Sequence, residues 1–276
     1  MEIRDLEKTG YFGYLFFIRY DGTKFDSFDE NKDKTSVKGE FKKLLDENNI
    51  SYYKGIQQAG RTDKDVSAEE NILYINTKQE LKLENFRNSS VILEIFDIKK
   101  TLPYLELPKL IEKRHYIYRY PKDRIKSSIE EIDEKCRELS GKHDVSAFTT
   151  KKGRELKEKI RELAVYYENQ ELHFTGSSFM PQQVRIMSGY ILTGKKQPLE
   201  GRYLTLEKII FSQELEDMII FEDNAISEIN IEKIERNREF LFFYVKKSKK
   251  GEVIGNKGKN IKKLRGKYGK IIIKEI

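Results

Sequence analysis

The sequence predicts an α+β fold in which helices cover one face of antiparallel sheets. Strand-like runs, the first of them the aromatic-rich segment Tyr14–Tyr20, alternate with segments that carry apolar residues at helical spacing. The connections are short, and the order of strand, helix and strands occurs once in each half of the chain. We therefore expect two similar α/β halves, followed by a short C-terminal unit.

Each element of the first half follows from a local pattern. Tyr14–Tyr20 is predicted as a buried strand, and the Asp21-Gly22-Thr23 sequence after it as a turn. A helix is indicated by four apolar residues at positions i, i+4, i+7 and i+8, which are Val37, Phe41, Leu44 and Leu45. Thr35 or Ser36 can supply its N-cap. Ile72–Thr77 and Val91–Ile98 are predicted as the strands that follow.

The second half repeats this order. His115–Tyr120 is predicted as a strand with three tyrosines on one face. The sequence from Ser128 to Glu131 is a capping box, and it opens a helix whose inward face includes Cys136. A second helix is predicted from about Pro181 to Gly194. Further strands are predicted at Leu163–Glu168, Glu171–Thr175, Ile226–Ile234 and Phe240–Lys246.

Composition excludes several classes of protein. The single cysteine, Cys136, leaves no partner for an internal disulfide and no thiolate cluster for a metal. No apolar run approaches the roughly 18 residues that cross a bilayer. Because the first residues do not resemble a signal peptide, we expect a cytoplasmic protein without a membrane partner.

The positive charge of the chain is concentrated at its C-terminal end. The net charge is +7, and residues 246–276 hold twelve Lys and Arg against two Glu. The preceding residues are therefore close to neutral. This distribution is typical of a nucleic-acid-binding tail on a neutral body, although a solvated Lys-rich end would give the same count.

The stretch Ala59-Gly60-Arg61-Thr62-Asp63 combines a glycine, a cation, a hydroxyl and a carboxylate. A carboxylate in a Gly-containing loop beside an arginine is a candidate nucleophile or base, because the cation favours its ionised form. A surface turn is the other interpretation, since Gly, Thr and Asp are common turn residues.

Four further stretches stand in a recognisable order around this one. Tyr20-Asp21-Gly22-Thr23 precedes it, with Phe25 and Ser36-Val37. Three stretches follow: Arg114-His115-Tyr116-Ile117-Tyr118; the sequence from Gly141 to Phe148; and Phe179 with Gln183-Val184-Arg185 and Gly189. Over roughly residues 11–235 the chain resembles the TruA-type tRNA pseudouridine synthases, which isomerise uridines in the anticodon arm. The resemblance implies a pseudouridine synthase fold, in which two similar halves meet around a central cleft.

The resemblance also implies the roles of particular residues. Asp63 would be the catalytic carboxylate, and Arg61 would help to displace the target base and hold its phosphate. Tyr116 would stack on that base, Arg185 would pair with Asp63, and Ile229 would shape the pocket. The isomerisation breaks the N-glycosidic bond, turns the base and rejoins it through carbon. It involves no redox step and no hydrolysis, so we expect no cofactor and no metal. Tyr116 could otherwise be a core aromatic, and His143 and His173 are interpreted as structural or surface residues.

The chain departs from the family pattern at two places. Asp65 and Ser67 stand where the family has Gly and His, and Ser27-Phe28-Asp29 stands where it has Gly, an aromatic residue and Gln. We expect Asp65, as a like charge nearby, to raise the pKa of Asp63. Such changes leave open an altered substrate or lost activity.

The basic tail contains a second motif. Gly255-Asn256-Lys257-Gly258 lies between apolar positions that include Ile254, Ile261 and Leu264, and it resembles the Gly-x-x-Gly core of a KH module. KH modules clamp single-stranded nucleic acid at this loop. We therefore expect a βααβ module that binds RNA through Gly255, Asn256, Lys257, Gly258, Lys259 and Lys262. A glycine-containing turn in a charged tail is the alternative.

These observations predict a domain order and three candidate functions. We expect an N-terminal synthase half at 1–105, a C-terminal half at 106–236 and the KH-like module at 237–276. The first function is pseudouridine synthesis in tRNA by a protein that, like its family, forms a homodimer. The second is RNA binding on a synthase fold that no longer catalyses. The third is synthesis at another tRNA or rRNA site.

Overall fold

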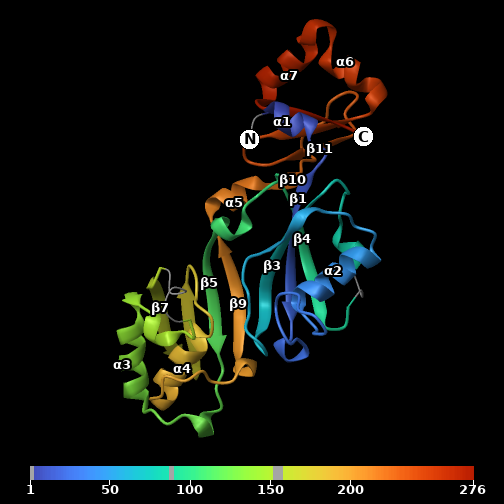
Figure 1. Ribbon diagram of the computed structural model, residues 1–276. Helices are drawn as coiled ribbons and strands as arrows, with labels where there is room; N and C mark the ends of the chain where they lie inside the picture. The colour runs from blue at the N-terminus through green and yellow to red at the C-terminus, as the bar shows by residue number, and fades with distance from the viewer. Residues whose placement is uncertain (1–2, 87–89, 152–157) are drawn as a thin grey trace.

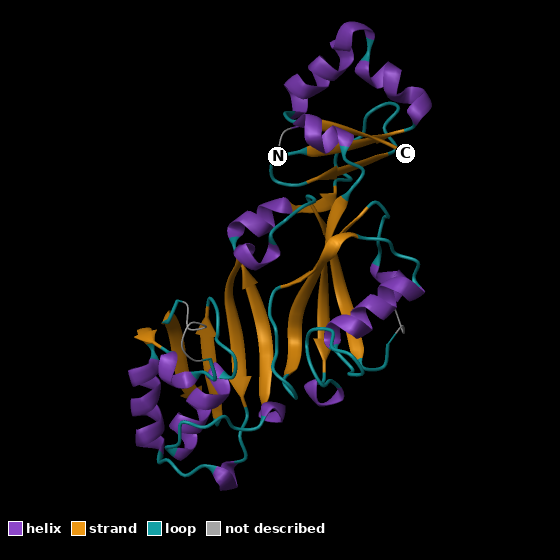
Figure 2. Cartoon of the chain, viewed as in Figure 1, coloured by secondary structure: helices purple, strands orange, loops and turns teal. Residues whose placement is uncertain are grey.

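The computed structural model describes residues 3–86, 90–151 and 158–276, and within them the strands form one continuous sheet (Figures 1 and 2). In the first half, β1 (Phe12–Tyr20) lies between β3 (Ser67–Thr77) and β4 (Leu93–Thr101), antiparallel to both. The strand β2 (Tyr53–Gln58) pairs with β3. The helix α2 (Val37–Glu47) begins at Ser36, whose Oγ accepts a hydrogen bond from Gly39 N at 3.1 Å.

The second half is built in the same way around β5 (Ile111–Tyr118), which lies between β9 (Leu204–Phe211) and β8 (Glu171–Gly176). The strands β7 (Ile160–Glu168) and β6 (Gly141–Asp144) continue the sheet. The helix α3 (Ile129–Leu139) opens on the predicted capping box, and Cys136 is buried on its inner face. The helix α4 (Gln183–Thr193) begins two residues after Pro181, the predicted start.

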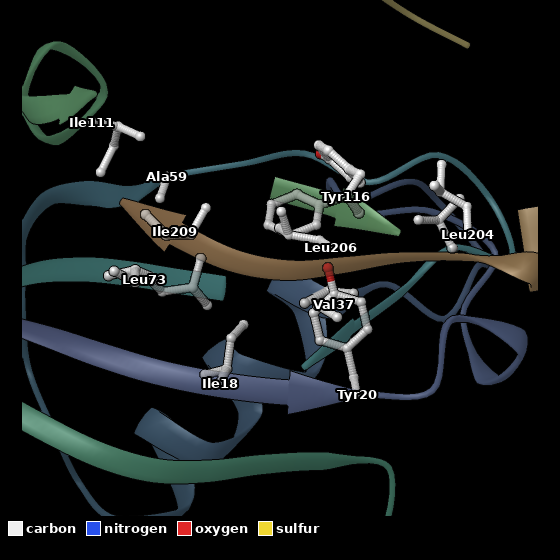
Figure 3. Packing of buried hydrophobic residues seen from close by; sticks show 14 of the residues in the cluster. Ile18, Tyr20, Val37, Ala59, Leu73, Ile111, Tyr116, Leu204, Leu206 and Ile209 are labelled. Atoms are coloured by element: carbon white, nitrogen blue, oxygen red, sulfur yellow. The ribbon is translucent and has the colours of Figure 1, made fainter. Parts of the chain in front are cut away.

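The two halves join edge to edge where β3 and β9 run parallel for two residue pairs, Ser67 with Thr205 and Ala68 with Leu206. Side chains from both halves pack across this junction, and Figure 3 shows Tyr20 and Val37 in the same cluster as Tyr116 and Leu206. The α+β fold predicted from the sequence is confirmed. The junction brings the loop after β2 against the second half.

The C-terminal strands extend the same sheet past β4. After α5 (Gln213–Met218), β10 (Ile219–Glu222) pairs with β4, β11 (Lys233–Arg236) with β10, and β12 (Leu241–Val245) with β11. The edge strand β13 (Ile271–Glu275) is parallel to β12, and α6 (Lys250–Ile254) and α7 (Lys259–Tyr268) connect the two. In Figure 1 these two helices lie at the end of the molecule farthest from α3 and α4.

Two features of this module differ from the predictions. The strand expected at Ile226–Ile234 is wrong over most of its length, because residues 223–232 form a loop whose apolar Ile226 and Ile231 pack beneath α6 and α7. The N-terminal helix α1 (Ile3–Lys8) was not predicted. It packs on β13 at the opposite face of the sheet, so both the sheet and the core of the module include residues before 237.

Within the described ranges, no helix combines the length and the apolar character that a bilayer crossing requires.

Candidate active site

A cavity of about 720 Å³ lies where the two halves meet. The loop at 58–64 forms one wall, and the start of α4 with Phe179 and Leu204 forms the other. Asp63 and Tyr116 line the same cavity, from the first and the second half respectively. The two halves therefore have to be assembled before this site exists.

The loop that carries Asp63 is held in place by hydrogen bonds to polar side chains of the neighbouring strands. Asn71 accepts a hydrogen bond from Gly60 N at 3.2 Å and donates one to Gly60 O at 3.0 Å. The hydroxyls of Tyr20 and Thr62 lie 2.9 Å apart, and burial raises the pKa of Tyr20 to about 12, which keeps that hydroxyl protonated. Arg114 donates to Ala59 O at 2.9 Å from the second half. These bonds leave the loop backbone little freedom to move.

The residues that depart from the family pattern are accommodated in this loop. Asp65 has φ 64°, in the left-handed region that Asp tolerates better than most residues. Ser67 Oγ accepts a hydrogen bond from Gly22 N at 3.0 Å. A Cβ on Gly22 would lie 2.2 Å from the Val66 backbone, so only glycine permits this approach. The loop keeps its conformation with Asp at 65 and Ser at 67.

Asp63 is a half-buried carboxylate with two partners on α4 and its N-cap. Its Oδ2 accepts a hydrogen bond from Gln182 N at 3.2 Å and lies 4.0 Å from Arg185 Nη1. Burial raises the pKa of Asp63, and Arg185 and the Gln182 amide oppose the rise. The sequence led us to expect this rise from the charge of Asp65, whereas its cause is burial. Arg185 is held in place by its Nε, which donates to Leu199 O at 2.7 Å.

The structure adds Gln182 to the site, a residue that no sequence motif singled out. Its backbone has φ 58° at the N-cap of α4, and this conformation aims its N–H at Asp63. Two polar residues before an apolar helix are a weak sequence signal, because nothing in them specifies a left-handed N-cap.

Tyr116 forms part of the cavity wall, and its ring meets Phe179 edge to face at a centroid distance of 5.2 Å. The side chain is buried, and burial raises its pKa, so the hydroxyl stays protonated. Asp63, Tyr116 and Arg185 therefore converge, as the resemblance implied.

Arg61 lies at the rim of the cavity, where its side chain is exposed. Its Nη1 is 3.4 Å from Asp29 Oδ2, and Lys38 Nζ is 3.3 Å from the other oxygen of the same carboxylate. Asp29 is one of the departures from the family pattern, so this chain gives Arg61 an ion-pair partner within the protein.

Two further sequence expectations concern residues outside this cavity. The expectation that Ile229 shapes the pocket is wrong, because Ile229 is 87% exposed in the loop before β11. His173 contacts His115, with ring nitrogens 3.2 Å apart, and His143 bonds to Ser140 O. No group of three potential metal ligands occurs among the described residues.

The Gly-x-x-Gly loop forms the turn between α6 and α7. Gly255, Lys257 and Gly258 all have positive φ, between 53° and 74°. Half of the twelve basic residues from Lys246 onward pair with carboxylates. Six form no ion pair within the described chain: Lys247, Lys257, Lys259, Lys262, Lys263 and Lys274, the last of which donates to backbone carbonyls instead. Four of these lysines, Lys257, Lys259, Lys262 and Lys263, lie in this loop and at the start of α7.

Comparisons with known proteins agree with this geometry. A family model described as tRNA pseudouridine synthase matches residues 136–204, and one described as KH domain matches residues 215–275. The tRNA pseudouridine synthase A of Pyrococcus abyssi is 30% identical over 209 residues, which cover 70% of this chain and 78% of that protein. The proteins of the same name from Picrophilus torridus and Oceanobacillus iheyensis are 30% and 28% identical, and the matches cover 67% and 66% of this chain and 72% and 82% of theirs. The chain therefore belongs to the tRNA pseudouridine synthase A family and carries a C-terminal KH domain.

Proposed function

We propose that the chain isomerises uridine to pseudouridine in tRNA, with the anticodon arm as the site of modification. The observation that carries the proposal is the half-buried Asp63 carboxylate, which faces a cavity walled by Tyr116 and has a cation, Arg185, as its partner. The names of the relatives supply the reaction. The departures at 65 and 67 do not favour an inactive protein, since the loop accommodates both.

The geometry assigns each group a task. Ionised Asp63 attacks the sugar or takes a proton from it, which releases the base from its N-glycosidic bond. The detached base turns within the cavity against Tyr116, and its C5 bonds to the sugar carbon that N1 had left. This step frees Asp63 from its ester or returns the proton that it took from the sugar; C5 then loses its hydrogen as a proton, and N1 gains one. Arg185 and the Gln182 amide stabilise the carboxylate in its charged form. Arg61, released from Asp29, holds the backbone of the flipped nucleotide.

A site-resolved map of pseudouridine in total RNA tests this proposal. We expect the map of a strain that lacks the protein to lose pseudouridine at anticodon-arm positions of tRNA, and purified protein to restore it. Loss at an rRNA position would contradict the proposed substrate, and an unchanged map would contradict the reaction.

Arg185→Gln should shift the pH dependence of the reaction. Without the guanidinium, the pKa of Asp63 rises further, because burial is then opposed by the Gln182 amide alone. We expect the acid limb of kcat/KM to move to higher pH. At pH 5.5, kcat/KM should therefore fall by a larger factor than at pH 8, because a smaller fraction of Asp63 is ionised in the variant. The measurement is a pH–rate profile under single-turnover conditions.

Arg124→Gln is the matched control for that variant, because Arg124 is exposed and pairs with Glu200 at 3.2 Å. We expect its profile to match the unmodified protein. An acid limb that stays in place in Arg185→Gln would show that Arg185 does not set the ionisation of Asp63.

Three lysines at the Gly-x-x-Gly loop that form no ion pair, Lys257, Lys259 and Lys262, should carry part of the RNA affinity. We expect the triple change of Lys257, Lys259 and Lys262 to Gln to weaken RNA binding. The slope of log K against log salt should fall by about 2, since each lysine that neutralises a phosphate of a single strand adds roughly 0.7 to it. Filter binding at four salt concentrations measures both. Truncation is a poorer test, since removal of β13 uncovers its neighbour β12, where Phe242 and Phe243 are buried.

A second triple variant controls for the loss of charge alone. Lys246, Lys249 and Lys250 lie in the same domain, but each pairs with a glutamate, at 3.2, 2.7 and 2.6 Å. We expect their change to Gln to lower the slope less. Equal slopes for the two triple variants would argue against a specific role for the Gly-x-x-Gly loop.

We also propose, from the resemblance, a cytoplasmic homodimer. Light scattering on the purified protein should give twice the chain mass of 32.7 kDa, and a monomer would overturn the assembly.

A further inference from the structure

Three tyrosines gather on the surface outside the catalytic cavity. The rings of Tyr11 and Tyr53 lie 5.3 Å apart, and Tyr104 lies 6.1 Å from each of them. Tyr53 and Tyr104 are 44% and 38% exposed, so ring surface is accessible to a ligand. Large aromatic side chains in mutual contact usually lie in the core, which makes this exposed group unusual.

Two lysines lie over these rings. Lys54 Nζ is 5.5 Å from the ring centre of Tyr53 and 6.0 Å from that of Tyr104, and Lys78 Nζ is 5.1 Å from the ring of Tyr11. Neither ammonium group has a carboxylate partner in the described part of the chain. We call Tyr11, Tyr53, Lys54, Lys78 and Tyr104 the tyrosine platform.

The backbone holds the platform in an unusual conformation. Lys54 and Tyr104 have φ 70° and 65°, in the left-handed region that non-glycine residues seldom adopt. Tyr104 is fixed there by two bonds, since its N donates to Asn76 Oδ1 at 2.7 Å and its hydroxyl lies 3.0 Å from Thr9 Oγ1. The ring is thus positioned by the fold and is not a loose surface side chain.

The platform lies between the catalytic cavity and the KH domain. A hollow of about 400 Å³ beside Lys54 and Tyr104 shares Pro108 with the catalytic cavity. Along β2, Tyr53 is five residues from Gln58 in the cavity wall, roughly 16 Å at about 3.3 Å per residue. On the other side, Thr9 O accepts a hydrogen bond from Lys274 of β13 at 2.6 Å.

We propose that the tyrosine platform binds the substrate RNA, by stacking unpaired bases on its rings while Lys54 and Lys78 contact the adjacent phosphates. The inference rests on the proposed function for the identity of the RNA. Exposed aromatic faces joined to unpaired cations fit a nucleic-acid strand, whose bases stack and whose phosphates are anionic. Continuity with the cavity gives that strand a path from the target uridine toward the KH domain.

The test measures RNA binding without turnover. In an Asp63→Asn background, fluorescence anisotropy gives the Kd for an unmodified tRNA transcript. We expect Tyr53→Leu with Tyr104→Leu to weaken binding by about tenfold or more, the loss expected when one or two stacked bases are released. Lys54→Gln with Lys78→Gln should lower the salt slope by about 1.4, at roughly 0.7 for each phosphate that a lysine neutralises. If the variant with both tyrosine changes does not fold, the variant with both lysine changes still tests the proposal.

Tyr166→Leu is the matched control, because Tyr166 is 43% exposed and stacks on His173 of β8, away from the platform. We expect its Kd to equal that of the background protein. Unchanged Kd and salt slope in both platform variants would overturn the proposal. The proposal would also be overturned if sedimentation showed that the platform variants lose a dimer while their RNA affinity is retained. The surface would then be an interface between copies of the chain. If the unmodified protein forms no pseudouridine while the platform variants still weaken RNA binding, the proposed function is refuted and the platform is supported.

Discussion

Asp63→Asn should abolish pseudouridine formation and leave the protein at least as stable at pH 7 as it was before. The reaction requires a carboxylate that attacks the sugar or accepts its proton, and an amide does neither. Burial holds the pKa of Asp63 above its ordinary value of 3.8, so the Asp63 carboxyl group binds its proton more tightly in the folded protein than in the unfolded chain. Stability from this group is therefore present at low pH and lost as pH rises through the folded-state pKa. Asn removes the charge that burial disfavours.

Two measurements check this expectation. A single-turnover assay on tRNA should find no product with Asp63→Asn or Asp63→Ala, and calorimetry should give a Tm for Asp63→Asn that is not lowered. Asp65→Asn is the control, because Asn tolerates the φ of 64° at that position and the change removes a charge two residues away. It should retain activity. Product formed by purified Asp63→Ala would remove Asp63 from the mechanism.

The parts of the site that could be predicted are those held in local sequence motifs. Asp63, Tyr116 and Arg185 each stand in a short stretch with a recognisable pattern. In the structure Asp63 and Tyr116 line one cavity, and Arg185 lies 4.0 Å from Asp63. Gln182 could not be predicted, because its contribution is a backbone N–H aimed by a left-handed φ of 58°. Side-chain identity carries little information about such a conformation.

The packing of α1 against the KH domain could not be predicted from the sequence, for a different reason. The helix α1 buries one leucine, Leu6, and its contacts with β13 join residues more than 260 positions apart in the chain. The hydrophobic periodicity of a short segment contains no information about such a long-range contact. The loop at 223–232 shows the opposite error, since Ile226 and Ile231 form an apolar pattern typical of a strand but pack under α6 and α7 from irregular backbone.

One buried carboxylate connects the KH domain to the synthase body. Glu235 of β11 accepts hydrogen bonds from Lys100 of β4 at 2.8 Å and from Tyr244 at 2.6 Å, and lies 2.7 Å from Lys233. Burial alone would raise the pKa of Glu235, but Lys100 and the other partners outweigh it and hold the pKa below 4.5. Its contribution to stability is therefore present above pH 4.5 and lost as pH falls through the lower folded-state value.

Glu235→Gln should lower the stability of this junction by about 3 kcal/mol, the low end of the range for breaking a buried ion pair. The buried Lys100 loses its nearest counter-charge and keeps only Glu80 at 3.9 Å, whereas Lys233 still pairs with Glu80 at 2.5 Å. Calorimetry should show an earlier transition, and hydrogen exchange should accelerate in β10–β13 before the synthase body. Glu232→Gln is the control, since its pair with Lys246 at 3.2 Å is exposed and is worth about 0–1 kcal/mol. If both variants unfold alike, the buried pair does not hold the domain to the body. The sheet pairing of β10 with β4 and the packing around Phe242 would then be what fixes the Gly-x-x-Gly loop relative to Asp63.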